Sequence, residues 1–167
     1  PFLVRTKLKS DINVRYIMVL HILEIGDQFP ISPFAIATAV EIYDRYLIIN
    51  QGEDDQTQLI LYYIAAVILA SCMHESHRLY PADFESVYKD TDIAAAMKSL
   101  FYDIRYVADS VSLWQIVTEQ VRLGVLENEE DKLEFYWEQV KKIYLNYESM
   151  IGLSKQQMAQ KILKLVK

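Results

Sequence analysis

Cysteine, proline and glycine are scarce in this sequence, whose 167 residues hold one cysteine, four prolines and four glycines. A single cysteine excludes an internal disulfide framework and suits a reducing compartment. Because no secretory signal is visible either, we expect an intracellular protein of the cytoplasm or nucleus. The prolines and glycines fall almost entirely between periodic segments, and no long Val/Thr-rich alternating run occurs. The sequence therefore predicts an all-α fold.

Positive charge is also in deficit. The chain has 17 Lys and Arg against 23 Asp and Glu, which gives a net charge of −6. Binding to a nucleic-acid backbone requires a basic face, so we do not expect a nucleic-acid partner. The composition, 52% hydrophobic and 24% charged, is that of a folded globular protein.

Signatures of catalysis are missing as well. The sequence contains no Gly-rich phosphate loop and no nucleophile elbow, and its carboxylates belong to helix faces and caps. One cluster has metal-ligand chemistry: Cys72, His74, Glu75 and His77. It lacks the i, i+4 histidine spacing of zinc proteases and is typical of a polar helix end entering a loop. We expect no enzymatic activity, no metal, no cofactor and no small-molecule substrate.

The stretch over residues 56–73 is uncharged and is apolar on every face from Leu59 to Ala70. Such a helix is either a membrane span or the central helix of a globular domain. A bilayer needs about 20 apolar residues, whereas this stretch begins Gln-Thr-Gln and has two tyrosines soon afterwards. We therefore expect a core helix and no membrane. Its alanines and serine would let neighbouring helices approach closely.

Capping residues mark the starts of several helices. Asp11 can cap the first helix, the pair Ser32–Pro33 begins the second, and Ser154 caps the last. We expect helices over residues 12–26, 33–49, 56–73, 81–88, 92–109, 112–123, 129–151 and 155–167.

The helix over residues 129–151 has an apolar and aromatic stripe at helical spacing. Its members are Leu133, Tyr136, Trp137, Val140, Tyr144 and Tyr147. We expect the stripe to pack on the preceding domain. The alternative is that part of it binds a partner, because Trp and Tyr anchor interfaces.

Three segments have a recognisable pattern at matching spacing: residues 14–25 (VRYIMVLHILEI), 39–47 (AVEIYDRYL) and 69–75 (LASCMHE). They resemble the first, second and third helices of a cyclin box. In that family the second helix is marked by Asp-Arg-Phe-Leu, and the third ends in Leu-Ala-Ser-Lys-Phe-Glu-Glu.

The resemblance implies a five-helix cyclin box around the central helix, followed by about three further helices. A second box does not fit in the remaining residues. The expected domains are an N-terminal extension (residues 1–10), the box (residues 11–111) and a C-terminal helical extension packing on it (residues 112–167).

The family's structural signature is an Arg on the first helix bonded to an Asp on the second, with a Leu on the third. Arg15, Asp44 and Leu61 occupy those positions. A guanidinium and a carboxylate between two helices form a directional, charge-assisted pair that would fix their packing.

The resemblance also implies a surface that binds a kinase, which in cyclins includes a Lys at the end of the third helix and a Glu on the fifth. Here Cys72 stands at the Lys position and Asp103 best matches the Glu, so the positive charge is missing. The apolar rim of this surface, which consists of Leu69, Met73, Ile104 and Val107, is still apolar. The implied partner-binding residues are Leu69, Cys72, Met73, Glu75, Asp103, Ile104 and Val107.

A second implied surface is the family's substrate-docking patch. It places Val14, Met18 and His21 where Met, Leu and Trp are usual, and Ile60 where Gln is usual, while Glu24 is kept. A groove without its Trp loses its largest apolar contact area. We therefore do not expect conventional recruitment of Arg-x-Leu substrates.

These features favour a non-enzymatic regulatory subunit that binds and activates or retargets a cyclin-dependent kinase. The alternative is a cyclin-fold adaptor or scaffold that no longer binds a kinase. Nucleic-acid binding through the related fold of transcription factor IIB is disfavoured by the acidic charge balance.

Overall fold

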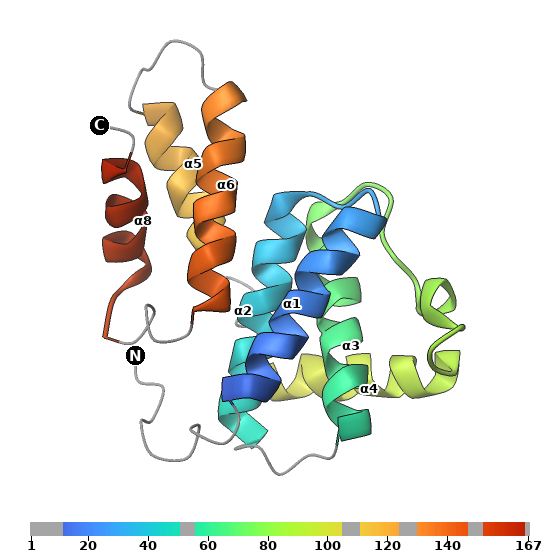
Figure 1. Cartoon of the computed structure of the whole chain (residues 1–167). Coiled ribbons are helices and arrows are strands. Elements are labelled where there is room, and N and C mark those ends of the chain that lie inside the picture. The colour runs from blue at the N-terminus through green and yellow to red at the C-terminus, as the bar shows by residue number, and fades with distance from the viewer. Residues whose placement is uncertain (1–11, 51–55, 105–110, 124–129, 147–151, 166–167) are drawn as a thin grey trace. The chain divides into compact units, whose positions relative to one another are not determined.

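The structure is a computed structural model of the whole chain, and it describes residues 12–50, 56–104, 111–123, 130–146 and 152–165. The expected N-terminal extension and Asp11, the expected cap of the first helix, lie outside the described residues. The described residues form helices and turns, with no strand among them, which confirms the all-α prediction (Figure 1). The chain divides into two compact units, an N-terminal unit (residues 3–110) and a C-terminal unit (residues 111–167).

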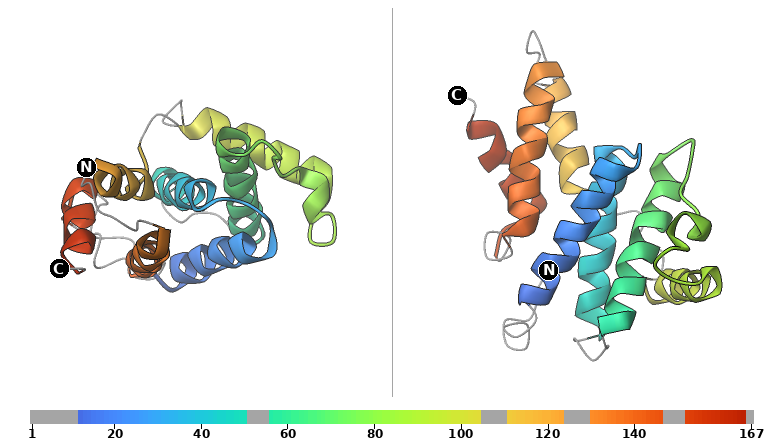
Figure 2. Two further views of the ribbon diagram at one scale, coloured as in Figure 1. Left: turned by 90° about the horizontal axis from the view of Figure 1, so that it is seen from above. Right: turned by 45° about the vertical axis from the view of Figure 1, so that its right-hand side comes forward.

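The N-terminal unit is built around its third helix, which packs against each of the other α-helices described in this unit. In Figures 1 and 2, the first three helices run side by side and the fourth crosses them. Its elements are α1 Ile12–Gln28, α2 Pro33–Asn50, α3 Gln56–His74, the 3₁₀ helix η1 Pro81–Phe84 and α4 Asp90–Ile104. The uncharged stretch of the sequence is thus the central helix, as predicted.

Small side chains let α2 and α3 pack closely. Ala65, Ala66 and Ala70 on α3 are buried, as are Ala35 and Ala39 on α2. Thr57–His74 is also long and apolar enough to cross a membrane, a test that the core helix of a soluble protein passes as well. In this structure α3 has helices packed along it, as a core helix does.

Gly26 of α1 lies close against the first turn of α2. A Cβ atom at this position would lie 2.9 Å from Cγ1 of Ile36 and 3.0 Å from its Cδ1. Ile36 is itself buried and cannot move away cheaply. The glycine is therefore required by packing, although glycine lowers the intrinsic stability of a helix.

The helix expected over residues 81–88 is wrong in length, because only η1 forms there. The Tyr80 N–H donates to Asp83 Oδ2 (2.7 Å), which closes a tight turn at its start. The N–H groups of Val87 and Tyr88 then both donate to the Phe84 carbonyl, so the chain leaves η1 in turns.

The C-terminal unit contains α5 Leu113–Leu123, α6 Glu130–Leu145 and α8 Lys155–Lys164. Each of these helices packs on the other two, most extensively α5 on α8. Two of these helices, α5 and α8, begin with a reciprocal cap. Ser112 exchanges hydrogen bonds with Gln115 (2.7 and 3.2 Å), and Ser154 does so with Gln157 (2.8 and 3.2 Å).

The helix expected to run from residue 129 to residue 151 is shorter in the structure. It ends at Leu145, where Asn146 donates its N–H to the Lys142 carbonyl and leaves the helix. Asparagine is a poor helix former and is common at helix ends. Gly152 has a φ of 78° and lies just before the cap of α8.

The aromatic stripe of α6 contributes to the core. Tyr136, Val140 and Tyr144 are buried, and Trp137 packs edge-on against Trp114 of α5, with ring centroids 5.2 Å apart. Its expected packing on the N-terminal unit stays a prediction, and Tyr147 lies outside the described residues.

Candidate functional site

A bidentate ion pair joins α1 to α2. Arg15 donates from Nε to Asp44 Oδ1 at 2.6 Å and from Nη2 to Asp44 Oδ2 at 2.8 Å. The Arg15 side chain is 2% exposed and that of Asp44 is 13% exposed. The planar fork of the guanidinium therefore sets both the distance and the rotation between the two helices. Leu61, the third residue of the implied signature, lies partly buried on α3.

The end of α3 is fastened to the start of α2. The Ser32 N–H, at the cap of α2, donates to Glu75 Oε1 at 2.7 Å. Six residues further along the chain, on α2, Thr38 Oγ1 lies 2.8 Å from His74 Nε2. Burial lowers the pKa of His74, and the nearby carboxylate of Glu75 opposes part of that change. His74 and Glu75 thus hold two helices together.

Ser71 fastens the same helix end to the chain that follows. It is fully buried, donates to the Ile68 carbonyl (2.7 Å) and accepts the Leu79 N–H (2.9 Å). The loop after α3, residues 75–80, therefore folds back against the helix. It lies beside the surface that the end of α3 forms.

Two residues of the implied partner surface point outward at this end. Cys72 is exposed, and Met73 is 44% exposed although it is large and apolar. Leu69, one turn earlier, is partly buried. The end of α3 therefore has an inner face that holds the fold and an outer face available to a partner.

Asp103 lies beside another part of α3. It is exposed on α4 and accepts a hydrogen bond from Ser99 Oγ (3.4 Å), which in turn accepts one from Tyr62 Oη (2.9 Å). Tyr62 precedes Cys72 by ten residues, or about 15 Å of helix. Asp103 and Cys72 thus sit at different levels of α3. The Ile104 side chain and Val107 lie outside the described residues.

The implied substrate-docking patch is only partly at the surface. Met18 is buried at 4% exposure, and Val14 and Ile60 are partly buried. His21 stacks on Tyr63 with ring centroids 5.8 Å apart and pairs with Glu24 at 3.1 Å.

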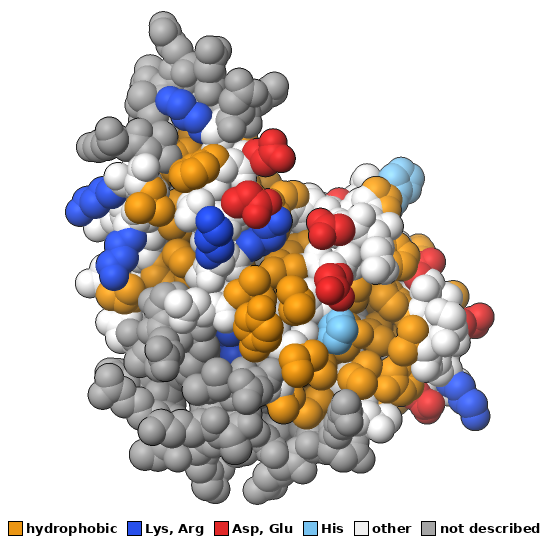
Figure 3. Space-filling view, in the orientation of Figure 1, with side chains coloured by type: hydrophobic (Ala, Val, Ile, Leu, Met, Phe, Trp, Pro, Cys, Tyr) orange, Lys and Arg blue, Asp and Glu red, His pale blue; other side chains and the backbone are white. Residues whose placement is uncertain are grey.

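The exposed large apolar residues described on α1 are not those of the implied patch. Tyr16 and Ile17 are 46% and 45% exposed. Figure 3 shows hydrophobic side chains gathered on the face of this unit that includes α1. The exposed apolar surface of α1 is therefore supplied by Tyr16 and Ile17, and not by Met18.

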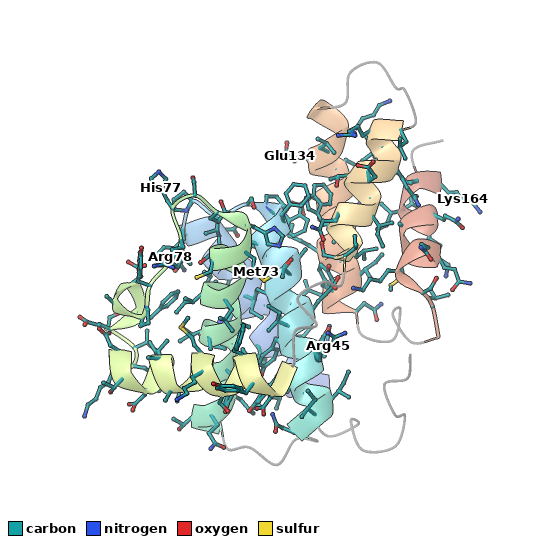
Figure 4. The ribbon with its side chains drawn as sticks, turned by 180° about the vertical axis from the view of Figure 1, so that it is seen from behind. Arg45, Met73, His77, Arg78, Glu134 and Lys164 are labelled. Carbon is teal, nitrogen blue, oxygen red and sulfur yellow. The ribbon has the colours of Figure 1, made fainter. Side chains whose placement is uncertain are left out.

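Arg78 is a further surface residue that sequence reasoning missed. Its guanidinium carbon lies 4.9 Å from the centroid of the Tyr80 ring. The pKa of Arg78 is raised chiefly by the Tyr80 side chain and also by Cys72. Figure 4 shows Arg78 and Met73 at the same end of the unit. No sequence signal places Arg78 there, because its position depends on how the loop folds back on Ser71.

The side chains of Cys72, His74, Glu75 and His77, which have metal-ligand chemistry, point in different directions. His74 and Glu75 face α2, whereas Cys72 and His77 are exposed. In the described ranges, no three His, Cys, Asp or Glu side chains are grouped so that they could hold a metal ion.

Comparison with known proteins agrees with this architecture. The family model described as "Cyclin, N-terminal domain" matches residues 2–106, which is more than half of the chain. Comparison with curated proteins gives no match. The matched residues include the ion pair between α1 and α2, the central helix α3 and the outward face at its end. The chain belongs to the cyclin family.

Proposed function

We propose that this protein is a regulatory subunit that binds a cyclin-dependent kinase and activates or retargets it. The observation that carries the proposal is the outer face at the end of α3. There Met73 and Cys72 are exposed on a helix end that Glu75 and His74 hold rigidly in a cyclin fold. Cyclins are regulatory proteins without catalytic activity of their own, and we propose the same for this chain, in the cytoplasm or nucleus.

Such a subunit acts on the conformational equilibrium of the kinase. Phosphoryl transfer requires the regulatory helix of the kinase to place its Glu beside the catalytic Lys. A partner that binds the active position of that helix better than the inactive one shifts the population toward activity. Burial of Met73 would supply part of the binding free energy, about 1.5–3 kcal/mol for a fully buried side chain.

The test uses the full chain and a panel of purified cyclin-dependent kinases. Binding is measured by biolayer interferometry, and activation by phosphate transfer to a basic substrate peptide. We expect at least one kinase to bind and to change its rate or its substrate preference. Failure of every kinase in the panel to bind would contradict the proposal.

Met73→Asp and Ile17→Asp form a matched pair for this test. The two native side chains are almost equally exposed, at 44% and 45%, but lie on different helices. Met73→Asp should abolish binding and Ile17→Asp should leave it intact. Full affinity in Met73→Asp would place the interface elsewhere, and equal loss in both variants would show that the effect is not specific to the end of α3.

One observation favours the second candidate, an adaptor or scaffold of the cyclin fold that no longer binds a kinase. Cys72 has no positive charge where the family has a Lys, and Asp103 lies at another level of α3. A scaffold would bind no kinase in the panel. Its melting temperature and helical signal would nevertheless be those of a fully folded protein.

A further inference from the structure

A fixed positive charge stands at the end of α3. Arg78 is exposed, and its guanidinium lies over the Tyr80 ring at 4.9 Å. Stacking on an aromatic face restricts a side chain that would otherwise have many rotamers. The guanidinium is thus held in place before any partner arrives.

The surroundings of Arg78 leave its charge available. In the part of the chain that the structure describes, no carboxylate forms an ion pair with Arg78. The two nearest carboxylates in the sequence are used by the backbone: Glu75 accepts the Ser32 N–H, and Asp83 accepts the Tyr80 N–H. Arg78 is therefore a local positive charge on a protein whose net charge is −6.

The charge stands within an apolar surface. Tyr80 is 51% exposed, Met73 is 44% exposed, and Cys72 is close enough to Arg78 to affect its pKa. A cation flanked by exposed apolar side chains is the usual composition of an interface hot spot, in which the apolar groups exclude water around the charged contact. The loop residue thereby supplies the charge that Cys72 lacks.

We propose that Arg78 is the cationic contact of this surface and that it binds a carboxylate of the kinase, with Tyr80 as its positioning residue. The inference rests on the proposed function, because the kinase is the partner it names. The occupant follows from charge complementarity: a guanidinium presents a planar fork of donors that a carboxylate matches with two hydrogen bonds.

The experiment compares charge variants of the full chain against whichever kinase of the panel binds the native protein. Arg78→Ala should weaken binding about tenfold and Arg78→Glu more, because an attraction becomes a repulsion. Arg78→Lys, which keeps the charge but loses the planar fork and the stacking on Tyr80, should bind with an affinity between those of the native protein and Arg78→Ala. Lys164→Glu makes the same change in net charge on α8, in the other unit, and should have no effect.

Two further measurements separate an electrostatic contact from a structural role. The difference between the native protein and Arg78→Glu should shrink as salt is raised, because exposed charges are screened. In the Arg78→Ala background, Cys72→Lys should restore part of the lost affinity, because it returns a cation to the same surface without the planar fork of the guanidinium. Thermal melts should be unchanged throughout.

The outcomes distinguish the two proposals. Full affinity in Arg78→Glu would overturn the assignment of Arg78 and leave the proposed function standing. Equal losses in Arg78→Glu and Lys164→Glu, or a loss independent of salt, would also overturn it. If no kinase binds the native protein, the proposed function fails and this inference fails with it.

Discussion

The ion pair between Arg15 and Asp44 gives the sharpest prediction about stability. Asp44→Ala leaves a guanidinium of 2% exposure without its carboxylate, and breaking a buried pair costs about 3–5 kcal/mol. Asp44 is 13% exposed, so the carboxylate left by Arg15→Ala can reach water, although a long buried stem is lost. We expect each variant to lower the free energy of unfolding by about 2–4 kcal/mol, with Asp44→Ala at the upper end.

A double-mutant cycle measures the interaction itself. The double variant should cost less than the sum of the single variants by about 1–3 kcal/mol, as measured by urea unfolding followed by circular dichroism. The exposed pair of Arg122 and Glu119, 3.8 Å apart on α5, is a matched control whose coupling should be below about 0.5 kcal/mol. Strictly additive losses for Arg15 and Asp44, or a coupling no larger than in the control, would refute the reasoning.

Three further predictions concern the end of α3 and the C-terminal unit. Met73→Asp should leave the helical signal and melting temperature nearly unchanged, because its side chain is 44% exposed; a drop of many degrees would show that it holds the fold. Burial lowers the pKa of His74 from 6.5, so the unfolded state takes up a proton first as pH falls. The stability that neutral His74 contributes through Thr38 should be complete above pH 6.5 and lost as pH falls toward the lowered pKa. Urea melts at about pH 7.5 and about pH 5.5 should show this loss, and His74→Gln should reduce it; an unchanged pH dependence would contradict the assignment. Ser154→Ala should destabilise the C-terminal unit by about 1 kcal/mol, because the Gln157 N–H loses its acceptor, and an unchanged urea midpoint would argue against that cap.

The helices could be predicted from the sequence because their signals are local. Ser32 before Pro33 begins α2, and Ser154 with Gln157 begins α8, in both cases through hydrogen bonds within one turn. The helix ends were predicted less well. Residues 81–88 give only η1, after which the N–H groups of Val87 and Tyr88 both donate to the Phe84 carbonyl and the chain continues in turns.

The site could be predicted where it depends on residue type and spacing. The pair of Arg15 with Asp44 was expected from the resemblance and is present. The direction in which each side chain points could not be predicted in the same way. Glu75 was assigned to the partner surface, but at least one of its oxygens holds Ser32. Met18 was assigned to the docking patch, but it is buried at 4% exposure, because helix rotation is decided by tertiary packing.

The fastening of α3 to α2 has a consequence for the kinetics of association. Glu75 and His74 order the helix end when the protein folds, so little conformational entropy remains to be lost when a partner binds. Association should then resemble the docking of two rigid bodies, with differences among partners appearing mainly in their dissociation rates. A substitution at Glu75 would loosen the surface, because the Ser32 N–H would lose its acceptor. It would slow productive encounters and make the affinity depend on how often the helix end returns to its native position.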